Sequence, residues 1–151
     1  MSKVRYCADE AQQMALGAEL SRSIDAPCIL FLEGDLGAGK TTLVRGFLRA
    51  RGYMGPVRSP TYTLVEPYPL GDETVYHLDL YRLADAEELE YLGLRDMLQS
   101  RNILLIEWPE RGHGRLPKPD LELHIQHQQD GRKITLQANT SAGERVIQES
   151  K

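Results

Sequence analysis

The most chemically specific segment of the chain is a glycine-rich stretch at residues 34–41. It reads Gly-Asp-Leu-Gly-Ala-Gly-Lys-Thr and matches the pattern G-x-x-x-x-G-K-[ST]. In this pattern the glycines permit a tight turn whose backbone N–H groups surround an anion. Lys40 would place a positive charge on the β- and γ-phosphates of a nucleotide, and the hydroxyl of Thr41 would ligate Mg²⁺. The spacing therefore predicts a site for nucleotide phosphates.

The segments on either side of this loop have the composition that such a site requires. Residues 28–32 form a continuous apolar run, which is typical of a buried parallel strand. After the loop, apolar residues recur at helical spacing and predict a helix over residues 40–51. The N-terminus of that helix would add its positive end to the loop. A glycine-rich turn that binds nothing would not need the Lys40–Thr41 pair, so we favour the phosphate site.

Two acidic residues stand at the ends of other predicted strands, at the sheet edge where α/β proteins bind ligands. Glu107 directly follows the apolar run 103–106, and Asp79 lies near the end of a predicted strand over 75–80. We favour Glu107 as the acid on the magnesium side, and Asp79 as a group that orients water or senses phosphate. Alone, either carboxylate could equally cap a helix or remain solvated. The glycine-rich loop in the same chain favours a function for both.

Hydroxyl side chains gather in the segment that follows the predicted helix. Pro60 disfavours helix at Ser59, and β-branched and aromatic residues predict an extended stretch from there to Tyr68. The hydroxyls of Ser59, Thr61 and Thr63 could reach a γ-phosphate, and such a segment can act as a switch between phosphate states. The alternative is an ordinary strand threonine with no role in binding.

Trp108 and two histidines are further candidates for a functional role. Trp108, the only tryptophan, lies beside Glu107 and could cover the site, serve a partner interface or simply fill the core. Core packing is the commonest case for a tryptophan.

His124 and His127 are three residues apart on a predicted strand and therefore face opposite sides of it. We reject a shared metal site for these two histidines.

The nature of the nucleotide follows from what the sequence lacks. Recognition of guanine would need Asn-Lys-x-Asp, and the nearest string is Pro-Lys-Pro-Asp at residues 117–120. Proline cannot supply the amide side chain of that motif. No glycine follows Asp79 at the spacing of a GTPase switch motif. We therefore predict that the nucleotide is ATP, with ADP as its product.

Composition indicates one globular domain over residues 1–151, since 41% of the residues are hydrophobic and 26% are charged. The net charge of −4 gives no global electrostatic basis for nucleic-acid binding. Cys7 and Cys28 are too few for a disulfide framework or a zinc motif. The first residues contain no apolar signal-like run, and no stretch approaches 18 apolar residues. We expect a cytoplasmic protein that makes no membrane contact.

Strand-like and helix-like segments alternate over the first two thirds of the chain. This order predicts an α/β fold, namely a P-loop NTPase domain with a mainly parallel central sheet flanked by helices. The C-terminal part differs, because apolar and polar residues alternate on both sides of an Asp-Gly pair at 130–131 and predict an antiparallel hairpin. The other predicted elements are a helix over 9–24, a helix from Asp85 that breaks at Gly93, and a short helix over 142–148.

Together these segments resemble the TsaE family of small bacterial P-loop ATPases. The resemblance runs from about residue 9 to residue 126, and the matching strings occur in the family's order. They are the 34–41 loop with Thr42, Ser-Pro-Thr-Tyr-Thr-Leu-Val-Glu at 59–66, His-Leu-Asp-Leu-Tyr-Arg at 77–82 and Glu-Trp-Pro-Glu at 107–110.

The resemblance implies a role for each matched position. Thr41 and Glu107 would hold Mg²⁺, the segment with Ser59 and Thr61 would be a nucleotide-sensitive switch, and Trp108 would contact a partner or support activity. The residues implied in ATP hydrolysis are Lys40, Thr61, Asp79 and Glu107. The residues implied in holding ATP or ADP are Leu36, Gly37, Ala38, Gly39, Lys40, Thr41 and Thr42.

The resemblance also implies a biological setting. The family works in the synthesis of threonylcarbamoyladenosine in tRNA, with the proteins TsaD and TsaB as partners and with tRNA contacted indirectly or weakly. ATP hydrolysis would reset the TsaB–TsaD complex between turnovers. Two alternatives remain open: a small-molecule P-loop kinase, and a nucleotide-gated assembly factor in which hydrolysis is incidental.

Overall fold

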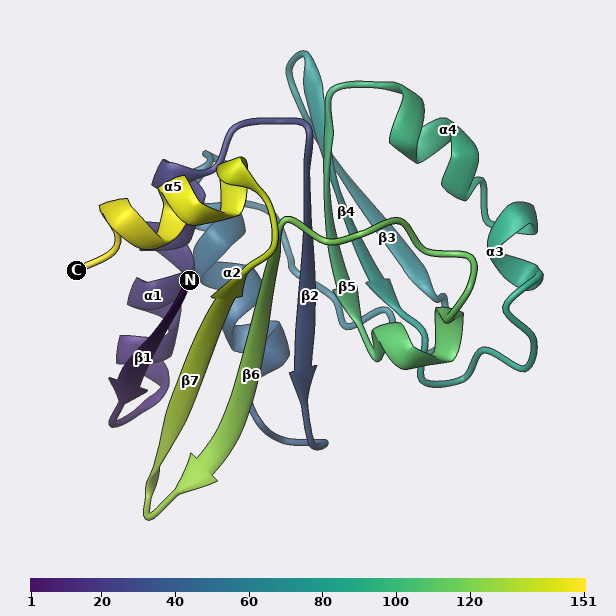
Figure 1. Ribbon diagram of the computed structural model, residues 1–151. Coiled ribbons are helices and arrows are strands. Elements are labelled where there is room, and N and C mark those ends of the chain that lie inside the picture. The colour runs from purple at the N-terminus through teal and green to yellow at the C-terminus, as the bar shows by residue number, and fades with distance from the viewer.

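One sheet of seven strands organises the chain, and the computed structural model describes residues 1–151. The strand order is β1-β7-β6-β2-β5-β4-β3, which places β2 in the middle (Figure 1). The strands are β1 (Ser2–Cys7), β2 (Cys28–Gly34), β3 (Val65–Leu70), β4 (Glu73–Asp79), β5 (Asn102–Glu107), β6 (Leu121–Gln128) and β7 (Gly131–Ala138).

The sheet is mixed, so the prediction of a mainly parallel sheet is wrong. Strand β2 runs parallel to its neighbours β5 and β6, and β4 runs parallel to β5. The pairs β1–β7, β3–β4 and β6–β7 are antiparallel. The predicted C-terminal hairpin is confirmed as β6–β7. The other two antiparallel pairs were not predicted. They are the hairpin of β3 and β4, and the edge pair of β1 with β7, whose residues are distant in the chain.

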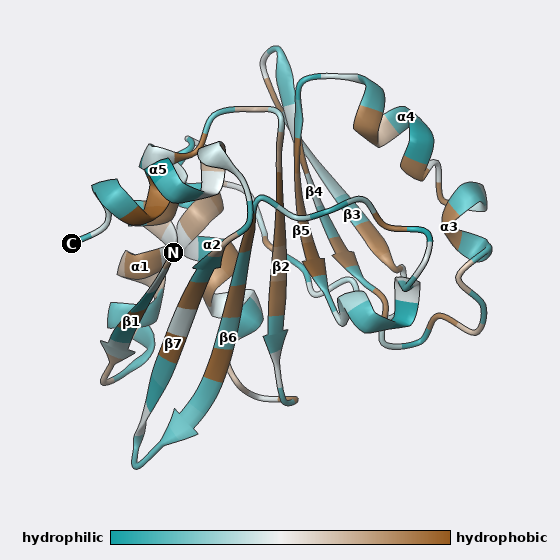
Figure 2. Ribbon diagram, in the orientation of Figure 1, coloured by the Kyte–Doolittle hydropathy of each residue, from teal (hydrophilic) through white to brown (hydrophobic).

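Helices cover both faces of the sheet. A larger apolar cluster joins α1, α2 and α5 to one face, and a smaller cluster joins α3 and α4 to the other. Figure 2 shows the corresponding hydrophobic bands along β2, β4 and β5. None of the helices combines the length and the apolar character needed to cross a bilayer. The helices are α1 (Glu10–Ser23), α2 (Lys40–Ala50), α3 (Glu88–Tyr91), α4 (Leu94–Gln99), α5 (Ser141–Glu149) and the 3₁₀ helix η1 (Pro109–Gly112).

Most predicted helices are confirmed within two residues at each end, including the break at Gly93 between α3 and α4. The extended stretch predicted from Ser59 is wrong over residues 61–64, which form a turn, and right only from Val65 onward. The Leu64 N–H donates to the Pro60 carbonyl at 2.7 Å, and Leu64 adopts a φ of 69°. A local backbone hydrogen bond therefore outweighs the β-propensity of the side chains in this segment.

Helices α1 and α2 pack backbone against backbone. A Cβ atom at position 46 would lie 2.0 Å from the carbonyl oxygen of Met14, so only glycine fits at this crossing. Because α2 begins at Lys40, this close packing fixes the start of α2 against α1. The glycine-rich loop therefore lies between β2 and a helix that is packed tightly against α1.

Candidate functional site

The 34–41 loop connects the carboxyl end of β2 to the first residue of α2. Within residues 35–41, only the Ala38 N–H donates to another backbone group, the carbonyl of Asp35 at 3.0 Å. The N–H groups of Gly37, Gly39 and Lys40 have no acceptor within the chain. Such N–H groups at a helix start are suited to hold an anion, because they carry the positive end of the helix dipole.

The carbonyl groups of the loop are held from the opposite side by two residues that sequence reasoning missed. Gln13 of α1 donates from Nε2 to the carbonyls of Ala38 (2.9 Å) and Gly39 (3.0 Å). Arg132 of β7 donates from Nε to Ala38 (3.1 Å) and from Nη2 to the Gly37 carbonyl (3.2 Å). Gln13 lies one helical turn before Leu16 on the buried face of α1. A polar residue in line with an apolar face needs a hydrogen-bond partner, so this position could have been singled out from the sequence.

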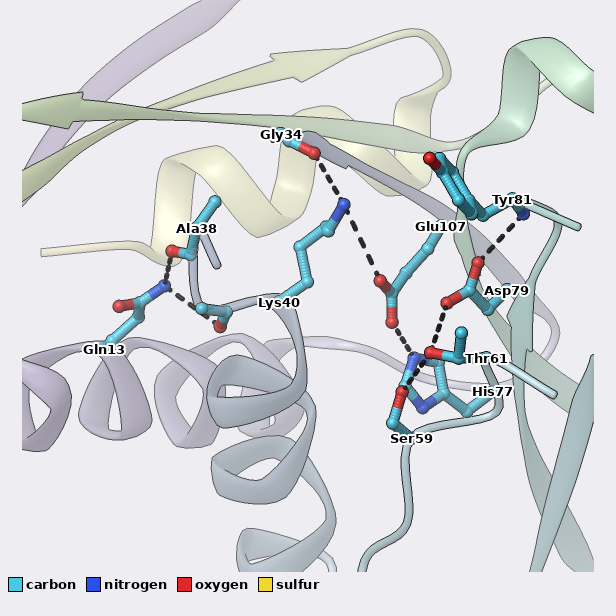
Figure 3. A network of polar contacts seen from close by, with 11 residues as sticks. Gln13, Gly34, Ala38, Lys40, Ser59, Thr61, His77, Asp79, Tyr81 and Glu107 are labelled. Atoms are coloured by element: carbon cyan, nitrogen blue, oxygen red, sulfur yellow. Dashed lines mark hydrogen bonds and ion pairs between the residues drawn. The ribbon is translucent and has the colours of Figure 1, made fainter. Parts of the chain in front are cut away.

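Lys40 is only 5% exposed and makes three contacts in the site. Its Nζ donates to the Gly34 carbonyl at 2.6 Å and lies 3.8 Å from Oε1 of Glu107 (Figure 3). The same ammonium group stands 4.2 Å from the centre of the Trp108 ring, within cation–π range. The structure thus places the lysine of the loop and the predicted magnesium-side acid next to each other.

The two predicted acids meet at the carboxyl edge of the sheet. Asp79 and Glu107 are register partners at the ends of the parallel strands β4 and β5, and both are buried. Oδ1 of Asp79 accepts from the Tyr81 N–H at 3.0 Å. Oε2 of Glu107 lies 2.5 Å from Nε2 of His77, a residue to which the sequence analysis gave no separate role.

The hydroxyl segment reaches this edge through Thr61. Its Oγ1 donates to Oδ2 of Asp79 at 3.3 Å and lies 2.7 Å from the hydroxyl of Ser59. Thr63 points elsewhere and donates to Glu66 at 3.1 Å. Of the hydroxyls in this segment, Ser59 and Thr61 therefore belong to the site.

Trp108 follows Glu107 in a left-handed conformation with a φ of 55°. One side of its ring meets the Lys40 ammonium, and the ring also packs at 5.0 Å from Tyr81. It touches the smaller apolar cluster as well, so the two readings of this residue, core and site, both describe its surroundings. Its Nε1 is buried without a hydrogen-bond partner.

The glycine-rich loop, the two acids and the hydroxyls of Ser59 and Thr61 line one open pocket of about 320 Å³. The loop supplies the donors, the ends of β4 and β5 supply the carboxylates, and the hydroxyl segment closes one side (Figure 3). The lining residues are Glu10, Leu36, Gly37, Gly39, Lys40, Thr41, Thr42, Ser59, Thr61, Asp79 and Glu107. Ala38 is buried behind the loop and does not line this pocket.

The fold and this pocket define an α/β protein with a strand–loop–helix unit and a polar cleft at the carboxyl edge of one mixed sheet. The family model described as threonylcarbamoyl adenosine biosynthesis protein TsaE matches residues 7–134. The chain belongs to the TsaE family.

Individual relatives agree with this assignment. A Haemophilus influenzae protein named tRNA threonylcarbamoyladenosine biosynthesis protein TsaE is 44% identical, over 97% of this chain and 96% of its own. A Bacillus subtilis protein of the same name is 38% identical, over 80% of this chain and 76% of its own. The crystal structure of Bacillus subtilis YdiB superposes with a TM-score of 0.81 at 27% identity, over 99% of this chain and 93% of that one.

Proposed function

We propose that this chain is a Mg²⁺-dependent ATPase that binds the TsaB–TsaD complex. By hydrolysing ATP it would reset that complex between turnovers and so support formation of the threonylcarbamoyl group on N6 of the tRNA adenosine beside the anticodon. Family membership supports the pathway, since the relatives carry the name tRNA threonylcarbamoyladenosine biosynthesis protein. The catalytic part of the proposal rests on the site itself.

One observation carries the ATPase: unpaired loop N–H groups, a buried lysine and two buried carboxylates all border the same pocket. A triphosphate carries its charge where these donors converge, and the helix start adds to the attraction. In the proposed complex, Lys40 exchanges its contact with the Gly34 carbonyl for the β- and γ-phosphates. Residues 36–42 then surround the phosphate chain through their N–H groups and hydroxyls.

The donor set also fits a magnesium ion. Thr41 offers a hydroxyl, and Glu107 offers a carboxylate oxygen that points toward Lys40 and the loop. Oxygen donors of this kind are those that Mg²⁺ selects, usually together with phosphate oxygens and water. When bound, the ion would neutralise charge that develops on the phosphates during transfer to water.

Asp79 and Thr61 supply the remaining functions of the proposed site. The Asp79 carboxylate stands beside Glu107 and accepts from the Thr61 hydroxyl, so it joins the pocket edge to the 59–64 segment. In the proposed mechanism, Asp79 orients the attacking water, and Thr61 reports the presence of the γ-phosphate by exchanging its partner. Trp108, whose ring contacts Lys40, serves either this response or the contact with the partner proteins.

The decisive experiment measures ATP hydrolysis by the purified chain alone, with TsaB plus TsaD, and with each variant of a matched pair. Glu107→Gln removes the proposed magnesium-side charge while keeping the shape of the side chain. Glu110→Gln makes the same chemical change at an exposed position three residues later. We expect stimulation by the partners, loss of at least ~100-fold in turnover for Glu107→Gln, and no effect for Glu110→Gln.

The alternatives predict different outcomes in the same assay. Full multi-turnover tRNA modification by a Glu107→Gln variant that still binds ATP would show that the chain is a nucleotide-gated assembly factor. Phosphorylation of an added small molecule, without stimulation by TsaB and TsaD, would indicate a kinase. If omission of the chain leaves tRNA modification unchanged, the proposed pathway role is wrong.

A further inference from the structure

The side chain of His77 lies entirely inside the protein, below the candidate site. Its exposed fraction is 0%, and it projects from β4 on the same face as Val75 and Asp79. On that face, Val75 packs into the larger apolar cluster and Asp79 borders the pocket. A histidine in such a place needs an explanation, because burying a polar ring without partners costs free energy.

The only polar contact of this ring is the carboxylate of Glu107. Nε2 of His77 lies 2.5 Å from Oε2 of Glu107, whereas Nδ1 is buried with no hydrogen-bond partner (Figure 3). In the tautomer with its hydrogen on Nε2, the ring donates this hydrogen bond to the carboxylate oxygen. The unpartnered Nδ1 shows that the ring is not placed there to satisfy both of its nitrogens.

Because of this contact, the two carboxylate oxygens of Glu107 have different neighbours. Oε2 is turned inward to the histidine, and Oε1 is left on the pocket side, 3.8 Å from the Lys40 ammonium. Rotation of the carboxylate would break this buried hydrogen bond and leave both groups without a partner, which costs free energy. His77 therefore holds Glu107 in one orientation before any ligand arrives.

We infer that His77 is a positioning residue that presents Oε1 of Glu107 to the magnesium ion of the proposed nucleotide complex. This inference rests on the proposed function. His77 does not touch the nucleotide, because Glu107 stands between it and the pocket. Outer partners that orient a metal-binding side chain typically change metal affinity by about 10- to 100-fold when they are lost.

A purely structural role of His77 predicts a different result on substitution from the positioning role. If His77 only filled the core, a shape-conserving apolar side chain would be tolerated or would stabilise the fold, and Mg²⁺ would bind as before. If His77 positions Glu107, the loss of its donor weakens the magnesium step while the core remains folded. Stability and magnesium dependence therefore separate the two roles.

The test compares His77→Gln with His77→Asn. Glutamine places its amide donor near the position of Nε2, whereas the shorter asparagine places it near Nδ1, out of reach of Glu107. His77→Phe removes the donor but keeps a ring, and Tyr76→Phe on the opposite face of β4 serves as control. The measurement is ADP affinity by titration calorimetry, with Mg²⁺ and with EDTA, alongside thermal unfolding.

We expect the gain in ADP affinity on adding Mg²⁺ to be smaller by about 10-fold or more in His77→Asn and His77→Phe. Their ADP affinity in EDTA should be unchanged. His77→Gln should recover most of that loss, and Tyr76→Phe should match the unaltered chain. Equal behaviour of the glutamine and asparagine variants, or equal losses with and without Mg²⁺, would overturn the positioning role.

The same titration distinguishes failure of this inference from failure of the proposed function. If the unaltered chain shows no ADP binding, or no gain from Mg²⁺, the proposed ATPase site is wrong. If the unaltered chain gains affinity from Mg²⁺ and all three His77 variants gain as much, only the positioning role is wrong.

Discussion

Asp79 and Glu107 are direct register partners at the ends of β4 and β5, yet their carboxylates have different neighbours. Asp79 accepts from the Tyr81 N–H and from the Thr61 hydroxyl, so it is joined to the turn that precedes β3. Glu107 contacts His77 and Lys40, so it is joined to the glycine-rich loop. Two similar acids at one sheet edge thus contact two different segments of the site.

Thr61 and Asp79 should act as one unit. Thr61→Val and Asp79→Ala each remove their shared hydrogen bond, and each should loosen the 59–64 turn. Because the proposed catalytic groups would then be misplaced, ATP turnover should fall by ~10-fold or more. Because both changes break one contact, the effect of the double variant on the turn should fall short of the sum of the single effects. Chymotrypsin cleavage after Tyr62, which is 81% exposed, measures the loosening directly. Thr63→Val is the matched control, since its hydroxyl contacts Glu66 instead; faster cleavage in this control would argue against the specific contact.

Lys40→Met should weaken ADP binding. The lysine supplies a charge-assisted hydrogen bond in the proposed complex, worth about 1.5–3 kcal/mol, which corresponds to about a 10- to 100-fold higher Kd. Titration calorimetry measures the change, and Lys118→Met, at an exposed position of the 113–120 loop, should leave the Kd unaltered. An unchanged Kd for Lys40→Met would contradict the assignment of the loop as a phosphate site.

Gly46→Ala should destabilise the fold. The added methyl group would meet the Met14 carbonyl at 2.0 Å, so α1 and α2 must move apart. We expect a loss of about 1–3 kcal/mol in the free energy of unfolding, as for other overpacked contacts. Urea denaturation measures it, with Arg45→Ala on the same helix as control. A gain in stability for Gly46→Ala would show that the helix crossing is looser than described.

Both cysteines should resist thiol reagents in the native protein. Burial raises the pKa of the Cys28 thiol to about 12, with Asp120 adding to the shift, and burial also raises the pKa of the Cys7 thiol. Since the thiolate is the reactive form, little of either thiol reacts at pH 8. Ellman's reagent should therefore label neither residue until the chain unfolds, and both afterwards. Rapid labelling of one thiol in the folded protein would contradict the burial of that side chain.

Glu33 should make stability fall as the pH rises through its folded-state pKa. Burial raises the pKa of this carboxyl above its ordinary value of 4.5; His124, 3.3 Å away, opposes the shift, and Glu122 and Glu110 add to it. The folded state then binds the proton more tightly than the unfolded state, so the stabilising contribution is complete below about pH 4.5 and is lost above it.

Glu33→Gln tests this dependence. The free energy of unfolding, measured by urea titration from pH 4 to pH 8, should rise relative to the unaltered chain as the pH increases and then level off. The reverse trend would mean that the ion pair with His124 outweighs burial.

Much of the fold was accessible from local pattern. The apolar run before the loop, the helical spacing after it and the Asp-Gly turn at 130–131 each indicated the right element, because periodicity and turn chemistry are properties of neighbouring residues. The two acids were also placed at the correct edge, since parallel strands end on the same side of a sheet. The errors lie where local preference was overruled. Residues 61–64 form a turn despite their β-propensity, and the pairing of β1 with β7 joins opposite ends of the chain.

The amino-acid order alone was enough to predict a phosphate site in the glycine-rich loop, because that prediction depends on residue types at fixed spacing within eight positions. Only the folded chain decided which distant side chains support it. The bracing of the loop by Gln13 and Arg132, and the turn of Glu107 toward His77, depend on helix packing and strand register. These contacts join residues that are 25 to 94 positions apart in the sequence. Sequence periodicity reports only on neighbouring residues, so it does not show which distant side chains come into contact.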